Sequence, residues 1–305
     1  MKIAISGATG FVGRHLTATL KRYGYTPVKL KRDDFNKGVT HLANVMHACE
    51  AVINLAGEPI NRRWTERYKL TMCASRIETT RLLVKAMERM AQKPQVFIST
   101  SAIGAFDDAG EYSEYDPPNA TDFLGLLSQE WETAAGEAEQ LGIRTLIFRF
   151  ALVLGHDGGL LKQLLTPFRL GLGGPIGNGR QAFSWVHIED LVDAYLFALK
   201  TPDIDGVFHL SAPEPVSNLE FTLTLGRLLH RPTLLPVPHT LLKLIFGEGA
   251  SVMTSGQKVI SKRLPECGYL FRYDKLELAL SDLIERSDKS SGSFSILNSG
   301  NYFRS

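Results

Sequence analysis

The chain has 305 residues, of which 44% are hydrophobic, and a formal net charge of +2. This length suits one large α/β domain, or a nucleotide-binding domain with a smaller lobe, and the balanced charge without basic blocks argues against a nucleic-acid partner. The three cysteines are far apart and form no C-x-x-C pair, which argues against disulfides and a zinc site and fits a reducing compartment.

No apolar stretch is long enough to span a membrane. The apolar N-terminal run resembles a signal peptide only superficially, because Gly7, Gly10 and Gly13 interrupt it and no small-residue cleavage site follows. We therefore expect a cytoplasmic protein with no membrane partner.

Strand-like and helix-like segments alternate along the first half of the chain. Hydrophobic periodicity predicts strands at 2–6, 26–31, 51–55, 95–99 and 144–154, and helices at 11–23, 75–90 and 123–141. This alternation is typical of a parallel sheet with helices on both faces, so the predicted fold class is α/β, with a Rossmann-type doubly wound sheet.

The pattern changes after Gly155, where a glycine-rich loop at 171–183 leads into a region of shorter elements. Strands are predicted at 184–187 and 207–211, and helices at 188–200 and 221–229. We expect an NAD(P)-binding domain over 1–213 with a substrate-side loop at 156–183, and a smaller C-terminal substrate lobe over 214–286. Residues 287–305 are rich in Ser, Gly and Asn and are predicted to be a disordered tail.

Three glycines spaced G-x-x-G-x-x-G follow the first predicted strand and open the first predicted helix. Such glycines allow a tight turn, let the backbone approach a pyrophosphate, and let the helix pack against the strand. The pyrophosphate would then lie against free N–H groups at the positive end of the helix. The cofactor contacts predicted here are Gly7, Thr9, Gly10, Phe11, Val12 and Gly13.

The end of the second predicted strand carries the basic pair Lys31 and Arg32. An acidic residue at this place binds the ribose 2′-hydroxyl of NAD, whereas basic residues favour the 2′-phosphate of NADP. Asp33 and Asp34 come slightly too late for the first role. The sequence therefore predicts NADP(H) as cofactor, with Lys31 and Arg32 at the 2′-phosphate.

These residues resemble the extended short-chain dehydrogenases/reductases. The resemblance rests on the glycine motif, on Asn54-Leu55-Ala56-Gly57 after the third strand and on Ser99-Thr100-Ser101-Ala102 after the fourth. Later segments, such as Gly171-Leu172-Gly173-Gly174-Pro175 and Ser184-Trp185-Val186-His187, are similar to an atypical subfamily named epimerase family proteins. The resemblance implies an NADP-type cofactor, with Leu55, Ala56 and Gly57 among its contacts, and a small C-terminal domain of unknown function over roughly 236–280. It implies no particular substrate.

The same resemblance leads us to expect a catalytic Ser, Tyr and Lys, in which the lysine lowers the tyrosine pKa. Ser101 matches the serine. When Glu132 is placed on the glutamate common in the following helix, however, Leu124 falls at the tyrosine position and Ser128 at the lysine position. Candidates for another proton donor are Tyr112, Glu132 and His187. Alternatively, Ser101 and water serve a reactive acceptor, or the protein binds NADP(H) without turnover.

The substrate side is predicted to include Arg180, which follows the glycine-rich loop and suits an anionic group on the ligand. Trp185 is placed either on the pocket floor or in the core. Neither a G-x-S-x-G elbow nor an H-E-x-x-H motif occurs, which argues against a serine hydrolase and a metal centre.

Two functions remain open. The first is an atypical NADP(H)-dependent oxidoreductase or epimerase-like enzyme on a small carbonyl or nucleotide-sugar substrate. The second is a non-catalytic, NADP(H)-binding regulatory or redox-sensing module. Dimerisation through two long helices is common in the wider family, so a homodimer is a further expectation from the resemblance.

Overall fold

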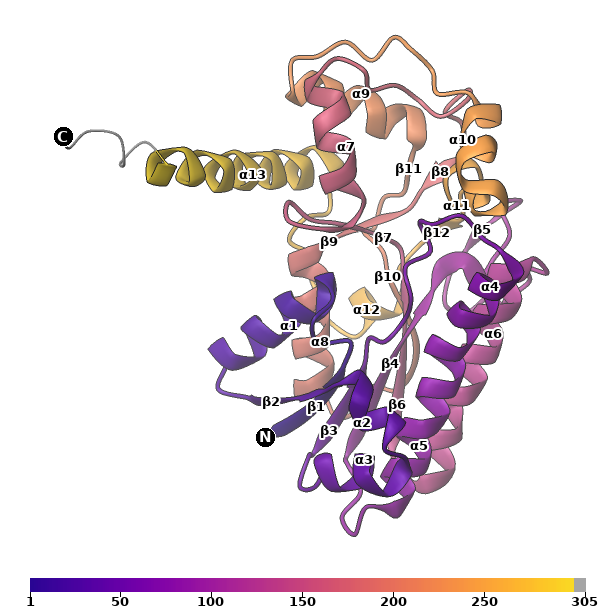
Figure 1. Cartoon of the computed structure of the whole chain (residues 1–305), viewed down its shortest axis with the longest axis vertical. Helices are drawn as coiled ribbons and strands as arrows, with labels where there is room; N and C mark the ends of the chain where they lie inside the picture. Colours follow the sequence, from indigo (N-terminus) through magenta and orange to yellow (C-terminus); the bar gives the residue numbers. More distant parts are fainter. Residues whose placement is uncertain (299–305) are drawn as a thin grey trace, which may run out of the picture.

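A six-stranded, entirely parallel sheet forms the centre of the computed structural model (Figure 1), which describes residues 1–298, with side chains to residue 289. The strand order is β10-β6-β4-β3-β1-β2. The strands are β1 (Lys2–Ser6), β2 (Thr26–Leu30), β3 (Ala51–Asn54), β4 (Val96–Ala102), β6 (Arg144–Phe150) and β10 (Gly206–Leu210). The predicted α/β fold class with a doubly wound parallel sheet is confirmed.

Alternate side chains of the central strands point to opposite faces of the sheet, and each face is buried by its own helices. On β1, Ile3 and Ile5 belong to a core cluster that also holds residues of α1 (Phe11–Arg22) and α8 (Ile188–Lys200). Ala4, between them, belongs to a second cluster with residues of α3 (Val39–Val45) and α5 (Thr79–Arg89). Strands buried on both faces explain why the sequence shows continuous apolar runs rather than alternation.

The smaller elements gather beyond the carboxyl ends of the sheet strands (Figure 1). They include two-stranded pairs formed by β7 (Leu152–Leu154) with β9 (Trp185–His187), β8 (Ala182–Phe183) with β11 (Val216–Ser217), and β5 (Glu111–Tyr112) with β12 (Lys258–Val259). Their helices are α7 (Gly159–Arg169), α9 (Asn218–Leu228), α10 (His239–Phe246) and α11 (Ser251–Thr254). The helix α12 (Arg263–Glu266) lies beside β10 instead, where Arg263 donates to the backbone oxygens of Asp205 and Val207. The proposed division at residues 213 and 286 stays a prediction.

Several elements differ from the sequence-based expectation. The predicted helix at 75–90 begins earlier, because α4 (Glu66–Cys73) runs through a π-helical turn at Ala74–Glu78 into α5. The region 156–183 is not only a loop, because it contains α7. The short helix α2 (Arg32–Asn36) and α3 lie between β2 and β3, where no helix was predicted.

The last helix is α13 (Leu276–Asn298), which includes the first residues of the segment predicted to be a disordered tail; that prediction for 287–305 stays a prediction. Ion pairs hold residues 288 and 289 of this helix: Lys289 pairs with Glu285 one turn earlier, and Asp288 pairs with Arg169 of α7. Residues 299–305 lie outside the described part of the chain. Among the described residues, no helix is both long and apolar enough to cross a membrane.

Candidate functional site

The glycine motif forms a tight turn between β1 and α1. Gly7 has a φ of +68°, and a Cβ added there would lie 2.5 Å from the carbonyl oxygen of Leu55. A Cβ on Gly13 would lie 2.2 Å from the carbonyl oxygen of Gly7. Only glycine therefore fits at the turn and at the contact between α1 and the turn.

The amino end of α1 is open to an anion. Its N-cap is Gly10, so no side chain accepts a hydrogen bond from the first backbone N–H groups of the helix. The first turn also contains no acidic residue. The first backbone N–H groups of a helix have no partner within the helix, and the helix dipole favours negative charge at this end. The turn thus fits the pyrophosphate of a dinucleotide, as the motif predicts.

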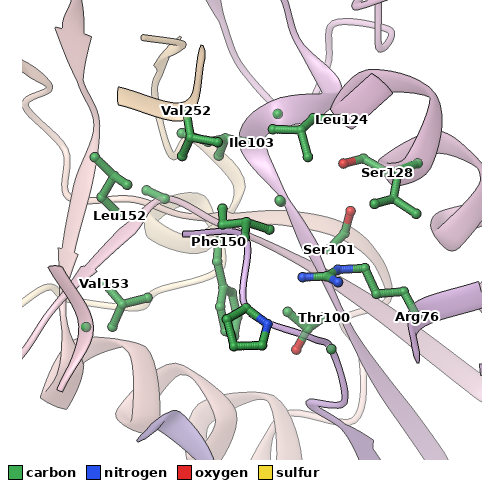
Figure 2. Close-up of a pocket in the computed structure, with 18 of the residues that line it drawn as sticks. Arg76, Thr100, Ser101, Ile103, Leu124, Ser128, Phe150, Leu152, Val153 and Val252 are labelled. Carbon is green, nitrogen blue, oxygen red and sulfur yellow. The ribbon is translucent and has the colours of Figure 1, made fainter. Parts of the chain in front are cut away.

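A cavity of about 550 Å³ extends from this turn along the carboxyl ends of β3, β4 and β6 to the segment 251–257 (Figure 2). Eight of the predicted cofactor residues line it: Gly7, Gly10, Phe11, Val12, Gly13, Leu55, Ala56 and Gly57. Thr9 does not line it. Ser101 lines the cavity from β4, and Leu124 and Ser128 line it from α6 (Phe123–Gly136).

Leu124 and Ser128 are one turn apart on α6, and Figure 2 shows both at the same side of the cavity. These are the positions that the resemblance assigns to the missing tyrosine and lysine. Among the residues that line the cavity, all within the described part of the chain, none is a tyrosine or a lysine. The standard acid–base pair is thus absent from the place where the fold would put it.

Ser101 is instead connected to a buried ion pair. Its hydroxyl donates a hydrogen bond of 2.6 Å to Oε1 of Glu132 on α6. Arg149, the register partner of Ser101 on β6, holds both carboxylate oxygens of Glu132, with Nε and Nη2 each at 2.7 Å. The Arg149 and Glu132 side chains are only 4% and 11% exposed. Because the Ser101 hydrogen is directed at Glu132, the lone pairs of its oxygen remain to accept a hydrogen bond.

The basic pair after β2 lies outside the cavity lining. Nη2 of Arg32 lies 2.7 Å from Oε1 of Glu58, just after Gly57, and the Arg32 side chain is 84% exposed. Lys31 is the N-cap of α2, and its backbone N–H donates to Asp34. That bond, with a second one from His41, lowers the pKa of Asp34, so this carboxylate is engaged in α2.

Two of the predicted proton donors are engaged elsewhere. Tyr112 stacks on Phe106 with ring centroids 4.8 Å apart, and its hydroxyl donates to Asp107, a bond that raises the Tyr112 pKa. His187 is fully buried, caps α8 through the N–H of Glu189, and stacks on Tyr273 at 3.7 Å. Burial lowers the His187 pKa to about 4. None of the three candidates lines the cavity, but Glu132 accepts the hydrogen bond of Ser101, which does.

The two predicted substrate residues also lie away from the cavity lining. Arg180 is exposed, and Trp185 is fully buried in the main core cluster, which agrees with the core alternative for the tryptophan. The neighbouring Ser184 lines the cavity instead. Two further residues line the cavity that were not predicted from the sequence: Arg76 from the π-helical turn and Val252 from α11. The hydrophobic pattern does not reveal a π-helical turn, so from the sequence Arg76 cannot be told apart from the other polar residues of the predicted helix.

The family model "NAD dependent epimerase/dehydratase family" matches residues 3–210. The chain belongs to this family. A second family model, a domain of unknown function, matches residues 237–283. The chain is 38% identical to the epimerase family protein SDR39U1 of Mus musculus, over 93% of this chain and all of the relative. It is 35% identical to the epimerase family protein YfhF of Bacillus subtilis, over 93% of this chain and 98% of the relative. The resemblance noted from the sequence is therefore confirmed.

Solved structures place the fold in the same group. The human epimerase family protein SDR39U1, solved with NADPH, superposes with a TM-score of 0.87 at 35% identity, covering 93% of this chain and 99% of that one. UDP-glucose 4-epimerase of Thermotoga maritima superposes with a TM-score of 0.76 at 18% identity, covering 95% and 99%. The second likeness concerns the fold alone. Together these findings establish an epimerase/dehydratase-family fold of the NAD(P)-binding type.

Proposed function

We propose that this epimerase-family protein is an NADP(H)-dependent oxidoreductase for a small carbonyl or hydroxyl compound. In this proposal Ser101 and Glu132 do the proton-transfer work that a tyrosine and lysine do elsewhere in the superfamily. The observation that carries the proposal is the hydrogen bond from Ser101, in the cavity wall, to a Glu132 carboxylate held by Arg149.

The cofactor would be held by the residues whose geometry fits it. The N–H groups at the start of α1 would bind the pyrophosphate, and Leu55 to Gly57 would border the adenosine half. Arg32, exposed at the end of β2, would bind the 2′-phosphate that distinguishes NADP from NAD. The human relative solved with NADPH supports this choice. When bound, the cofactor supplies or accepts a hydride.

The direction of the Ser101 hydrogen bond suggests how a proton would move. In alcohol oxidation the substrate hydroxyl gives its proton to Ser101 Oγ, while the Ser101 proton passes to Glu132. Carbonyl reduction runs the same relay in reverse, from Glu132 through Ser101 to the substrate oxygen. Arg149 fixes the carboxylate so that one oxygen faces Ser101. Apolar side chains in the cavity wall, among them Leu124 and Phe150, limit water around the reacting atoms.

The first experiment is a titration of the purified protein with NADPH and with NADH, followed by a screen of carbonyl acceptors monitored by cofactor absorbance. We expect tighter binding of NADPH, and turnover with at least one acceptor. Ser101→Ala should lower kcat by about 100-fold or more. Ser128→Ala is the matched control, because it removes a hydroxyl from the same cavity that makes no bond to Glu132, and it should retain most of the activity.

One observation favours the second function, a non-catalytic NADP(H)-binding regulatory module: the described cavity lining contains no tyrosine or lysine. Tight NADPH binding without oxidation by any acceptor would select this module over the enzyme. An equal loss of activity in Ser101→Ala and Ser128→Ala would refute the proton relay through Ser101 and Glu132, although the protein would still be an enzyme.

A further inference from the structure

The cavity contains a single positively charged side chain. Among the residues that line it, all within the described part of the chain, Arg76 is the only arginine or lysine. Asp122 is the only carboxylate, and it is already used as the N-cap of α6, where it accepts the N–H of Gly125 at 2.8 Å. The remaining lining is neutral, so Arg76 is the one cationic side chain in this lining that a ligand could meet.

Arg76 has no carboxylate partner among the described ion pairs. Its Nη2 donates to the backbone oxygen of Glu58 at 2.9 Å, and its Nη1 donates to the backbone oxygen of Met72 at 3.4 Å. The Glu58 carboxylate is turned to Arg32 instead. Because a guanidinium has five N–H donors, several remain for a ligand. Burial lowers the Arg76 pKa, as expected for a cation removed from water.

The backbone and the side chains around Arg76 fix the position of its guanidinium. The π-helical turn Ala74–Glu78 interrupts the helix formed by α4 and α5, and such turns are frequent at functional sites. Thr80 donates to the backbone oxygen of Arg76 at 2.6 Å and accepts the indole N–H of Trp131 at 2.9 Å. The guanidinium carbon lies 5.4 Å from the centre of the Trp131 ring. A planar cation supported on an aromatic face is pre-organised for a planar anion.

We propose that Arg76 binds the carboxylate of a small organic acid whose reacting carbon lies at Ser101. This inference rests on the proposed function. Figure 2 shows the guanidinium of Arg76 pointing inward, to the part of the cavity that Ser101 and Thr100 line. The cofactor's pyrophosphate already has its own N–H groups at the start of α1, so Arg76 is left for the substrate. A bidentate guanidinium–carboxylate pair matches the planar fork of arginine. The cavity of about 550 Å³ also has to admit the nicotinamide, which favours a small acid.

The test uses oxamate, an unreactive analogue of a 2-oxo acid, and oxamide, its neutral counterpart. Each is titrated by calorimetry into the protein, both alone and saturated with NADPH. The variants are Arg76→Gln, Arg76→Lys and the control Arg67→Gln, which removes an exposed arginine from α4. We expect oxamate to bind the NADPH-loaded protein and oxamide to bind at least about 10-fold more weakly.

Arg76→Gln should weaken oxamate binding by about 10- to 100-fold, and Arg76→Lys should restore part of it. Arg67→Gln should change nothing, and NADPH affinity should stay the same in all variants, which also shows that they fold. Oxamate binding that survives Arg76→Gln, or no oxamate binding by the native protein, would overturn the inference. A parallel loss of NADPH affinity in Arg76→Gln would also overturn it, because Arg76 would then serve the cofactor. Failure of the native protein to bind NADPH would instead refute the proposed function.

Discussion

Ser101 and Glu132 come from different elements, β4 and α6, and are joined by a hydrogen bond of 2.6 Å. The register of the sheet helps to bring Ser101 and Glu132 together. Ser101 lies opposite Arg149 on the neighbouring strand β6, and Arg149 donates hydrogen bonds to the Glu132 carboxylate. Ser101, at the cavity wall, is thus linked through the Glu132 carboxylate to the Arg149 guanidinium. Leu124 and Ser128, at the positions that the resemblance assigns to the tyrosine and lysine, line the same cavity as Ser101.

The buried pair Glu132–Arg149 should be sensitive to removal of one partner. Glu132→Leu leaves Arg149, only 4% exposed, without its anion, and such a change costs about 3–5 kcal/mol of the free energy of unfolding. The double variant Glu132→Leu with Arg149→Met should recover most of this loss, because it removes the uncompensated charge. Urea unfolding of the native protein, of Glu132→Leu and Arg149→Met singly, and of the double variant measures both effects. A loss below about 1 kcal/mol in each single variant would contradict a tightly buried pair.

The ion pair between Arg32 and Glu58 should tune the choice between NADPH and NADH. Arg32→Ala is expected to weaken NADPH binding much more than NADH binding, since only NADPH carries the 2′-phosphate. Glu58→Gln removes the carboxylate 2.7 Å from Arg32, so it should raise NADPH affinity by about 2- to 5-fold and leave NADH affinity unchanged. Fluorescence titration at low salt measures both. Equal changes for the two cofactors in both variants would remove Arg32 from the 2′-phosphate site.

The sequence predicted the sheet and the phosphate turn well because both depend on local patterns. Gly7 has a positive φ, Gly13 approaches the backbone of its own segment closely, and the buried strands are apolar on both faces. The neighbours of Ser101 were harder to foresee. Arg149 lies beside Ser101 through the register of β4 and β6, and Arg76 lines the cavity from a π-helical turn. The burial of His187 under Tyr273 likewise depends on how the C-terminal segment packs on α8.

The buried imidazole of His187 should make stability depend on pH. Burial lowers its pKa from 6.5 to about 4 in the folded protein, so between these values the unfolded chain binds a proton that the folded chain does not. Stability from this group is therefore complete above about pH 6.5 and is lost as the pH falls towards 4, at about 1 kcal/mol per pH unit. His187→Asn keeps a helix-capping side chain but removes the titration. The difference in unfolding free energy between native protein and variant should shrink over this range.

Asp190, three residues later, should act in the opposite direction. Burial raises its pKa from 3.8 to about 6, although it accepts the backbone N–H groups of Arg272 and Tyr273. Between these values the folded protein holds a proton that the unfolded chain releases, so this group destabilises the protein as the pH rises. Relative to the native protein, Asp190→Asn should therefore gain stability from pH 4 to 6. A pH-independent difference in either variant would show that the folded pKa of that group is close to its ordinary value.

Gly13 and Gly136 provide a matched test of the close approach at the phosphate turn, because both lie within helices at negative φ. An alanine Cβ at Gly13 would lie 2.2 Å from the backbone oxygen of Gly7, whereas at Gly136 it would meet no atom within 4 Å. Gly136→Ala should therefore stabilise the protein by about 0.5–1 kcal/mol, since alanine is the better helix former. Gly13→Ala forces α1 away from the turn, so it should lower both the melting temperature and the affinity for NADPH. Melting followed by calorimetry and NADPH titration separate the two effects. If Gly13→Ala behaved like Gly136→Ala in both measurements, α1 would not need to pack closely on the turn that is proposed to hold the pyrophosphate.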